Sequence, residues 1–438
     1  MTSFFLMRAP LAGVQLKDVF CGRSCYGQRP AREPPRQTRS SSKFFRSKLS
    51  MTLLLVACLL AVFYTQVGYT CVMWLLARFF PRRPDAALPL PEAVTIVLCV
   101  HNGAKEIEQR LRNLAACQWE GAREILVFCD GCEDDTAARA AQSGIAGVRV
   151  LSCAEQRGKW AAINDAVKSA SHPIIVFADM RQTFDPGALK KLAEAFRDPA
   201  VGAVSGLLEI SASGSGSGRG VDLYWRIERK LREWEARFDS VIGCTGAIYA
   251  IRRELFTELP PGTILDDVVI PMQIAFQGRR IAYEPRAVAF DPQNLEPARE
   301  KGRKLRTLVG NFQMLEQHPR WLLPWRNRLW WQLLSHKYAR LTVPWLLGTI
   351  AILSFVAPKS PFIWSLLGLQ ALCYLLGILG CVFPGWRSRW VTVPAGFLLL
   401  QWSCACAPLA YLRVRRDPLK LWKLRTTGPQ PEAVQPRP

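Results

Sequence analysis

Four long, uncharged apolar segments constrain the fold of this chain more than any other feature. A helix needs roughly 20 apolar residues to cross the hydrocarbon core of a bilayer, where each backbone polar group must find its partner within the segment. All four segments are long enough, and 50% of the 438 residues are hydrophobic. The sequence therefore predicts an integral membrane protein. The segments are Met51–Ala77, Leu341–Pro358, Ser360–Trp386 and Trp390–Leu412.

The stretches around these segments predict the domain organisation. The first apolar segment starts too late and is too long for a secretory signal, which favours a retained anchor. Met51 directly precedes it, so translation from either Met1 or Met51 is compatible with the sequence. We expect a disordered basic N-terminus (1–50), a transmembrane helix (51–80), a soluble domain (85–320), an interfacial helix (321–340), transmembrane helices (341–414) and a basic, Pro-rich tail (415–438).

The net charge of +22 does not indicate a nucleic-acid partner. Ten Lys/Arg but only two Asp/Glu lie in residues 1–50, and many other cations flank the apolar segments. This placement favours contact with anionic lipid. No motif that reads DNA or RNA accompanies the charge.

The orientation signals conflict. Arg78, Arg82 and Arg83 favour a cytoplasmic soluble domain if the chain begins at Met51, whereas the basic segment 29–48 favours the reverse if it begins at Met1. The cysteines of the soluble domain fall mainly on predicted strands and helices, as reduced, buried thiols do in the cytoplasm. We expect the protein in the plasma or inner membrane with this domain on the cytoplasmic side.

The soluble domain alternates strand-like and helix-like segments. Short apolar runs separated by helices of about ten residues predict right-handed βαβ units, and hence an α/β fold with a parallel sheet covered on both faces. The predicted strands are Val94–Val100, Glu124–Cys129, Val148–Leu151 and Ile174–Ala178, and the predicted helices between them are Lys105–Cys117, Asp134–Gln142 and Lys159–Ala170.

Apolar residues then recur every three or four positions from Tyr224 to Phe238, which predicts an amphipathic helix. Its apolar face would pack on the sheet, line an acceptor channel or contact the membrane.

Carboxylates follow predicted strands or open loops at three places: Asp130, Asp179 and the pair Asp266–Asp267. The carboxyl ends of parallel strands meet at one edge of the sheet, where ligands bind. Transfer of a sugar from a nucleotide donor needs such a set, since one group holds the nucleoside, one holds a divalent cation against the diphosphate and one takes the proton of the attacking hydroxyl. Each carboxylate alone could instead bond a turn N–H, but their spacing along one domain favours a shared site.

Seven motifs follow one another along the soluble domain. They are Val94–Asn102, Val127–Thr136, Arg157–Asn164, Phe177–Asp179, Thr245–Ile248, Leu265–Asp267 and Arg303–Thr307. In this order they look like the motifs of the family 2 glycosyltransferases, most of all the membrane-integrated group with cellulose, hyaluronan and poly-N-acetylglucosamine synthases and ceramide glucosyltransferase.

This resemblance implies a GT-A fold, with its Rossmann-like parallel sheet, and inverting transfer from a UDP-sugar with Mg²⁺ or Mn²⁺. Asp179 would bind the metal at the diphosphate, and Asp267 would be the general base, with Asp266 beside it in the catalytic motif. The other implied site residues are Asn102, Asp130, Lys159, Arg303 and Arg306 for the nucleotide donor, and Thr245 and Gly246 on the acceptor side.

Two residues depart from the family pattern. The second carboxylate of the usual Asp-x-Asp is Arg181, and the terminal Trp of the last motif is Thr307. Either Asp179 holds the ion together with diphosphate and water, which Mg²⁺ accepts readily, or Arg181 partly substitutes for the cation.

The leading hypothesis is a membrane glycosyltransferase that extends a saccharide, with the interfacial helix and C-terminal spans forming an exit path. One alternative is transfer of a single sugar to a lipid acceptor. An alternative of another class is a non-enzymatic membrane scaffold or transporter. The expected partners are a UDP-sugar donor, a saccharide or lipid acceptor and the bilayer, but no nucleic acid.

Overall fold

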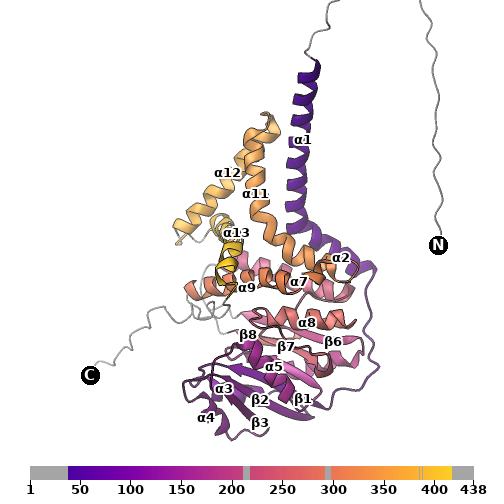
Figure 1. Ribbon diagram of the computed structural model, residues 1–438, viewed down its shortest axis with the longest axis vertical. Coiled ribbons are helices and arrows are strands. Elements are labelled where there is room, and N and C mark those ends of the chain that lie inside the picture. Colours follow the sequence, from indigo (N-terminus) through magenta and orange to yellow (C-terminus); the bar gives the residue numbers. More distant parts are fainter. Residues whose placement is uncertain (1–37, 211–217, 292–296, 384, 387, 417–438) are drawn as a thin grey trace, which may run out of the picture. The chain divides into compact units, whose positions relative to one another are not determined.

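The computed structural model describes residues 38–210, 218–291, 297–383, 385–386 and 388–416 (Figure 1). The expectations for residues 1–37 and for most of the tail from 415 to 438 therefore lie outside the described residues. Helix α1 (Thr38–Phe63) begins before the first apolar segment, within the stretch for which we expected disorder. Extending an existing helix adds one hydrogen bond per residue, so it is easier than starting one.

A mixed sheet of eight strands lies at the centre of the described part of the α/β domain. Its strand order is β3-β2-β1-β4-β7-β6-β8-β5. The strands are β1 (Ala93–Val100), β2 (Ala122–Asp130), β3 (Val148–Cys153), β4 (Ile174–Ala178), β5 (Thr183–Phe184), β6 (Val201–Ile210), β7 (Ile248–Arg252) and β8 (Arg280–Asp291).

Strands β1 to β4, which the sequence predicted, are parallel neighbours, as expected. The other half of the sheet differs, because β7 pairs antiparallel with both β4 and β6, and β5 pairs antiparallel with β8. Strand β8 runs parallel to β6, and β6 runs in the same direction as β4. The carboxyl ends of β1, β2, β4 and β8 therefore share one edge. The loop that precedes β7 enters at the same edge, since Ile248 pairs with Ala178.

Helices cover both faces of the sheet because its strands are buried on both sides. Residues of α5 (Lys159–Ser169) and α8 (Asp266–Phe276) belong to the hydrophobic cluster on one face. Residues of α3 (Ile107–Ala115) and α6 (Ala188–Glu194) belong to the cluster on the other. The short helix α4 (Thr136–Ala141) adds Ala140 to the second cluster.

Among the described residues, four helical segments are long and apolar enough to cross a membrane: Ser50–Phe79, Trp330–Val356, Pro361–Val382 and Arg389–Val414. They overlap the four apolar segments found in the sequence. The first contains the end of α1, a π-helical turn (Tyr64–Gly68) and α2 (Tyr69–Phe79). The last two are α12 and α13.

The segment expected to be one interfacial helix has a different form. A 3₁₀ turn (Pro319–Leu322) is followed by α10 (Trp330–Leu333), which continues through a second π-helical turn (Leu334–Tyr338) into α11 (Ala339–Val356). A boundary at residue 340 therefore falls inside one helix. The buried side chains of Trp321, Leu329 and Leu333 belong to the same hydrophobic cluster as α5 and α8, which draws this segment into the core.

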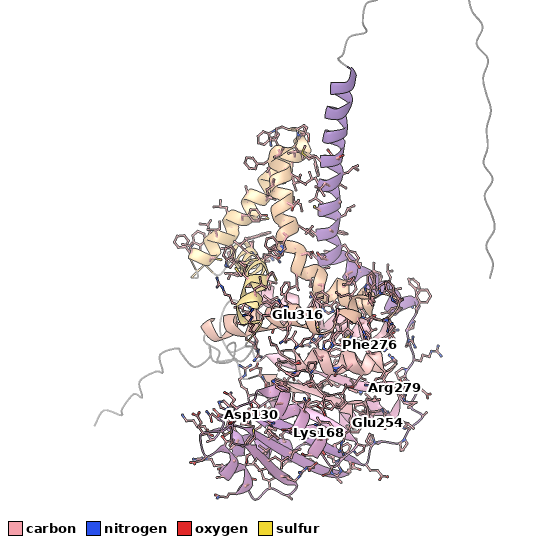
Figure 2. All side chains as sticks on the ribbon, viewed as in Figure 1. Asp130, Lys168, Glu254, Phe276, Arg279 and Glu316 are labelled. Atoms are coloured by element: carbon pink, nitrogen blue, oxygen red, sulfur yellow. The ribbon has the colours of Figure 1, made fainter. Side chains whose placement is uncertain are left out.

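Two amphipathic helices, α7 (Gly218–Phe238) and α9 (Pro297–Gln317), lie between the sheet and the apolar helices (Figure 1). Leu231 of α7 is fully buried with Tyr69 and Met73 of α2, so the apolar face packs on the first span rather than on the sheet. On α9, Glu316 accepts hydrogen bonds from Tyr411 and Arg415 at the end of α13 (Figure 2).

Candidate active site

Asp130, the last residue of β2, organises the loop that leads to α5 (Figure 2). One carboxylate oxygen accepts the backbone N–H of Arg157 at 2.9 Å, and the other accepts that of Gly158 at 2.8 Å. Gly158 has φ +98°, which L side chains rarely adopt, so glycine suits this turn. Asp130 thus fixes the start of α5 and with it Lys159.

Asn102 connects the loops after β1 and β2. Its side-chain oxygen accepts the backbone N–H of Glu133 at 2.8 Å, and its own N–H donates to Cys132 Sγ at 3.4 Å. Among the described residues, Asn102 is the one residue other than glycine with a positive φ, at 53°. Asparagine is one of the few non-glycine residues that tolerate this conformation. Asn102 therefore braces the loop beside Asp130 from an exposed position.

Lys159 joins the carboxylates of two different elements. Its Nζ lies 3.2 Å from Asp179 Oδ1, just after β4, and 3.1 Å from Asp266 Oδ2, at the start of α8. Burial alone would lower the pKa of Lys159, but Asp179, Asp266 and Asp267 hold it above its usual value. The ammonium is therefore a fixed positive charge between these groups.

The carboxyl group of Asp267 has a raised pKa. Burial, and then the negative charge of Asp266, raise its pKa to about 6, although the cations of Lys159 and Lys337 oppose the rise. Its backbone oxygen accepts the N–H of Cys244 at 2.7 Å. A carboxylate whose pKa lies close to neutrality suits proton abstraction at physiological pH.

The residues before β7 approach Asp267 closely. A Cβ placed on Gly246 would lie 2.9 Å from Asp267 Oδ2, so a larger residue here would displace the carboxylate. Beside it, Thr245 N–H donates to Ser205 Oγ at 2.9 Å, and Arg232 Nη1 donates to Thr245 Oγ1 at 2.9 Å. The expected acceptor-side residues therefore do border the expected base.

Two arginines, Arg181 and Arg303, converge on a residue that the motifs did not indicate. Arg181 pairs with Asp291, the buried last residue of β8. Arg303 Nη1 lies 3.7 Å from the same carboxylate oxygen. Arg306 lies one helical turn further along α9.

Asp179 is the carboxylate at the strand edge that a divalent ion could use. The side chain of Asp179 is 39% exposed, so an oxygen remains accessible to an ion whose other ligands are diphosphate and water. Arg181 occupies the position of a second carboxylate ligand. Within the described ranges, no three His, Cys, Asp or Glu side chains cluster in a way that could hold a metal ion. The residues thus fit a site with one carboxylate and not one with two.

A buried charged cluster lies between α7 and the second π-helical turn. His336 contacts Glu235 through Nδ1 and Glu228 through Nε2, both at 2.8 Å, and Arg340 Nη1 lies 3.0 Å from Glu228. Tyr69 of α2 donates to Glu235. This cluster joins the membrane segments to α7, whose Arg232 contacts Thr245.

Comparison with known proteins identifies the class. A family model described as "Glycosyltransferase like family 2" matches residues 91–323, more than half of the chain. The chain belongs to this family and is a glycosyltransferase. The alternative of a non-enzymatic scaffold or transporter is therefore dropped.

Two curated relatives are glycosyltransferases of bacteria. The chain is 29% identical over 184 residues to an N-acetylglucosaminyltransferase of Rhizobium leguminosarum bv. viciae, covering 41% of this chain and 43% of the relative. It is 31% identical over 127 residues to a poly-β-1,6-N-acetyl-D-glucosamine synthase of Staphylococcus aureus, covering 28% and 31%. The chain thus spans less than half the length of the curated relatives it matches.

A solved structure supports the GT-A fold. It is a mannosyltransferase from Pyrobaculum calidifontis in complex with GDP-Man and Mn²⁺, with a TM-score of 0.62 and 21% identity, covering 82% of this chain and 98% of that one. At this identity the similarity concerns the fold.

The structure brings most of the expected site residues to one strand edge. Asn102, Asp130, Asp179 and the loop of Thr245 and Gly246 follow or precede strands there, and Lys159 links that edge to Asp266. Sequence reasoning missed Asp291, whose partner Arg181 lies 110 positions away in the chain, and Arg232, which contacts Thr245. Arg181 gave the one sequence signal for Asp291, because an arginine at a position that usually carries a carboxylate needs an anionic partner.

Proposed function

We propose that this glycosyltransferase transfers a sugar, with inversion at the anomeric carbon, from a UDP-sugar to a growing saccharide at the membrane. The observation that carries the proposal is the linked set of Asp179, Lys159, Asp266 and Asp267. It combines a donor-side carboxylate, a fixed cation and a carboxylate of raised pKa. Such a set supplies the charge control and the base that the transfer requires.

In the proposed reaction, the oxygen of the acceptor hydroxyl attacks the anomeric carbon, and Asp267 takes the proton of that hydroxyl. The bond from that carbon to the β-phosphate oxygen breaks, and the nucleoside diphosphate leaves with the electron pair. Lys159 holds Asp179 and Asp266 in place during this step. A divalent ion held by Asp179 would neutralise charge on the leaving diphosphate.

The nucleotide portion of the donor would bind along the loops after β1 and β2. Asp130 and Asn102 shape these loops, and the exposed side of the loops would face the nucleoside. Arg303 and Arg306 of α9 would contact the diphosphate, because a guanidinium meets phosphate oxygens with two parallel N–H groups. Thr245 and Gly246 would border the acceptor hydroxyl beside Asp267.

The donor can be identified with a panel of nucleotide sugars. Full-length protein in detergent or lipid nanodiscs is incubated with UDP- and GDP-sugars, with and without Mg²⁺ or Mn²⁺, and nucleotide release is measured. UDP-N-acetylglucosamine is the first donor to test, because both curated relatives are named for this sugar. Release from no donor under any of these conditions would contradict the proposal.

Transfer of one sugar to a lipid acceptor is the second candidate. The observation that favours it is Lys337, which comes from a membrane-spanning helix and yet lies near enough to lower the pKa of Asp267. The base is thus influenced from the membrane side of the domain. Product length separates the two candidates: a labelled donor yields a ladder of saccharides in one case and only one-sugar glycolipids in the other.

A further inference from the structure

The departure at Arg181 exchanges a negative charge for a positive one. In the family pattern this position carries a carboxylate that helps to hold a metal ion. Replacement of Asp by Arg changes the local charge from −1 to +1, a difference of two units. This is the same change in charge as the binding of one divalent cation.

The Arg181 side chain is fixed at both its base and its tip. Arg110 Nε donates to the backbone oxygen of Asp179 at 3.0 Å and so holds the turn that carries Arg181. At the tip, the guanidinium pairs with Asp291 Oδ2, to which Gln182 Nε2 also donates at 3.3 Å. Pairing of β5 with β8 sets this contact, because Thr183 lies opposite Phe290.

Two arginines share this carboxylate. Arg303 Nη1 lies 3.7 Å from Asp291 Oδ2, so the guanidinium groups of Arg181 and Arg303 meet at one oxygen. The side chain of Asp291 is only 5% exposed, whereas those of Arg181 and Arg303 are 31% and 35% exposed. The buried carboxylate thus anchors two cations that remain accessible to a ligand.

A purely structural pair would leave few polar atoms without partners. Among the described residues, Nε of Arg181 is buried and has no hydrogen-bond partner. Buried polar groups are nearly always paired, so this unpaired donor calls for an acceptor from a ligand or water. Asp291 Oδ1 and Gln182 Oε1 lack partners as well, but as acceptors they would not meet a phosphate.

We propose that Arg181 and Arg303, held by Asp291, form a cationic site for the diphosphate of the donor that replaces the second metal-binding carboxylate. Asp291 is a positioning residue in this proposal and does not contact the donor. The inference rests on the proposed function for the identity of the ligand. It predicts that nucleoside diphosphate binds with appreciable affinity even when divalent ions are removed.

The test measures binding of UDP to the full-length protein, by calorimetry in lipid nanodiscs, in EDTA and in Mn²⁺. Hydrogen bonds between charged groups contribute enough that Arg181→Gln should weaken binding roughly ten- to hundredfold in EDTA, and less in Mn²⁺, where the ion carries part of the charge. Arg181→Lys, which keeps the charge but loses the fork, should recover part of the loss. Asp291→Asn should weaken binding as well, because it releases both arginines.

The matched control is Arg112→Gln, which removes an exposed arginine on α3 that pairs only with Glu108. It should bind UDP like wild type. Melting temperatures of all variants show whether a loss reflects unfolding, and Arg181→Lys keeps the test valid if Arg181→Gln is unstable.

The result that overturns the inference is equal UDP affinity of wild type and folded Arg181→Gln in EDTA. Wild-type binding that is absent in EDTA and restored by Mn²⁺ would overturn it too, while leaving the proposed function intact. The proposed function fails separately, if wild type binds UDP but turns over no nucleotide sugar.

Discussion

The clearest test of the mechanism is the pH dependence of kcat/KM, since the pKa of Asp267 lies near 6 instead of the usual value of about 3.9. A base works only when it is ionised. The rate should therefore rise with pH, reach half its plateau at about pH 6 and level off above about pH 7. At pH 5 about one-tenth of the base is ionised, so kcat/KM should be roughly one-tenth of its plateau.

The neighbouring carboxylate offers a perturbation whose direction follows from the structure. Asp266 raises the pKa of Asp267 by its negative charge, so Asp266→Asn should shift the rising limb to lower pH by about one unit. Its loss also frees Lys159 to act on the remaining carboxylates, which moves the limb the same way. Glu108→Gln, a change to an exposed pair on α3, should leave the limb in place.

The assay is initial-rate nucleotide release from pH 4.5 to 8.5, with intact protein confirmed at each pH by its fluorescence. The residual activity of Asp267→Asn should show no limb near pH 6. If that variant retained the same limb, or if the midpoint stayed put in Asp266→Asn, Asp267 would not be the titrating base.

Three further outcomes can be measured. Asp267→Asn should lower kcat by about 10² to 10⁴, or about 3–5 kcal/mol, with little change in UDP affinity. Gly246→Ala should reduce kcat without a change in melting temperature, because its Cβ would lie 2.9 Å from Asp267 Oδ2 and would displace that oxygen. The control Gly348→Ala in α11 should be neutral, because its Cβ would meet no atom within 4 Å. His336→Ala removes the imidazole shared by two buried glutamates of α7, although Glu228 keeps Arg340 and Glu235 keeps Tyr69. It should destabilise the folded protein by about 1–3 kcal/mol, measured as a lower melting temperature, with a smaller loss for His336→Gln.

The parallel half of the fold could be predicted because its signals are local. Strands β1, β2 and β4 are short, largely buried apolar runs that end at or just before a polar residue. The strand containing Phe177 was predicted with the bounds that the structure shows, Ile174–Ala178. Asp130 and Asp179 could then be placed at one edge from the topology alone.

Strands β7 and β8, in the other half of the sheet, lacked such signals. β7 (Ile248–Arg252) is short, and its place between β4 and β6 depends on pairings with distant strands. β8 contains Pro285, which interrupts a strand pattern. Asp291 at its end could not be recognised as a partner of Arg181, because the two residues are 110 positions apart.

The packing beyond residue 320 affects how this enzyme can be handled. Trp321, Leu329 and Leu333 fill the same core as α5 and α8, and His336 balances two glutamates of α7. A recombinant fragment ending at residue 320 would leave part of the core around α5 and α8 uncovered and would remove His336 and Arg340 from the two glutamates of α7. Soluble expression of the α/β domain alone should therefore give aggregated protein, and inhibitor screens or crystallisation will need the enzyme with its spans, in a bilayer mimic.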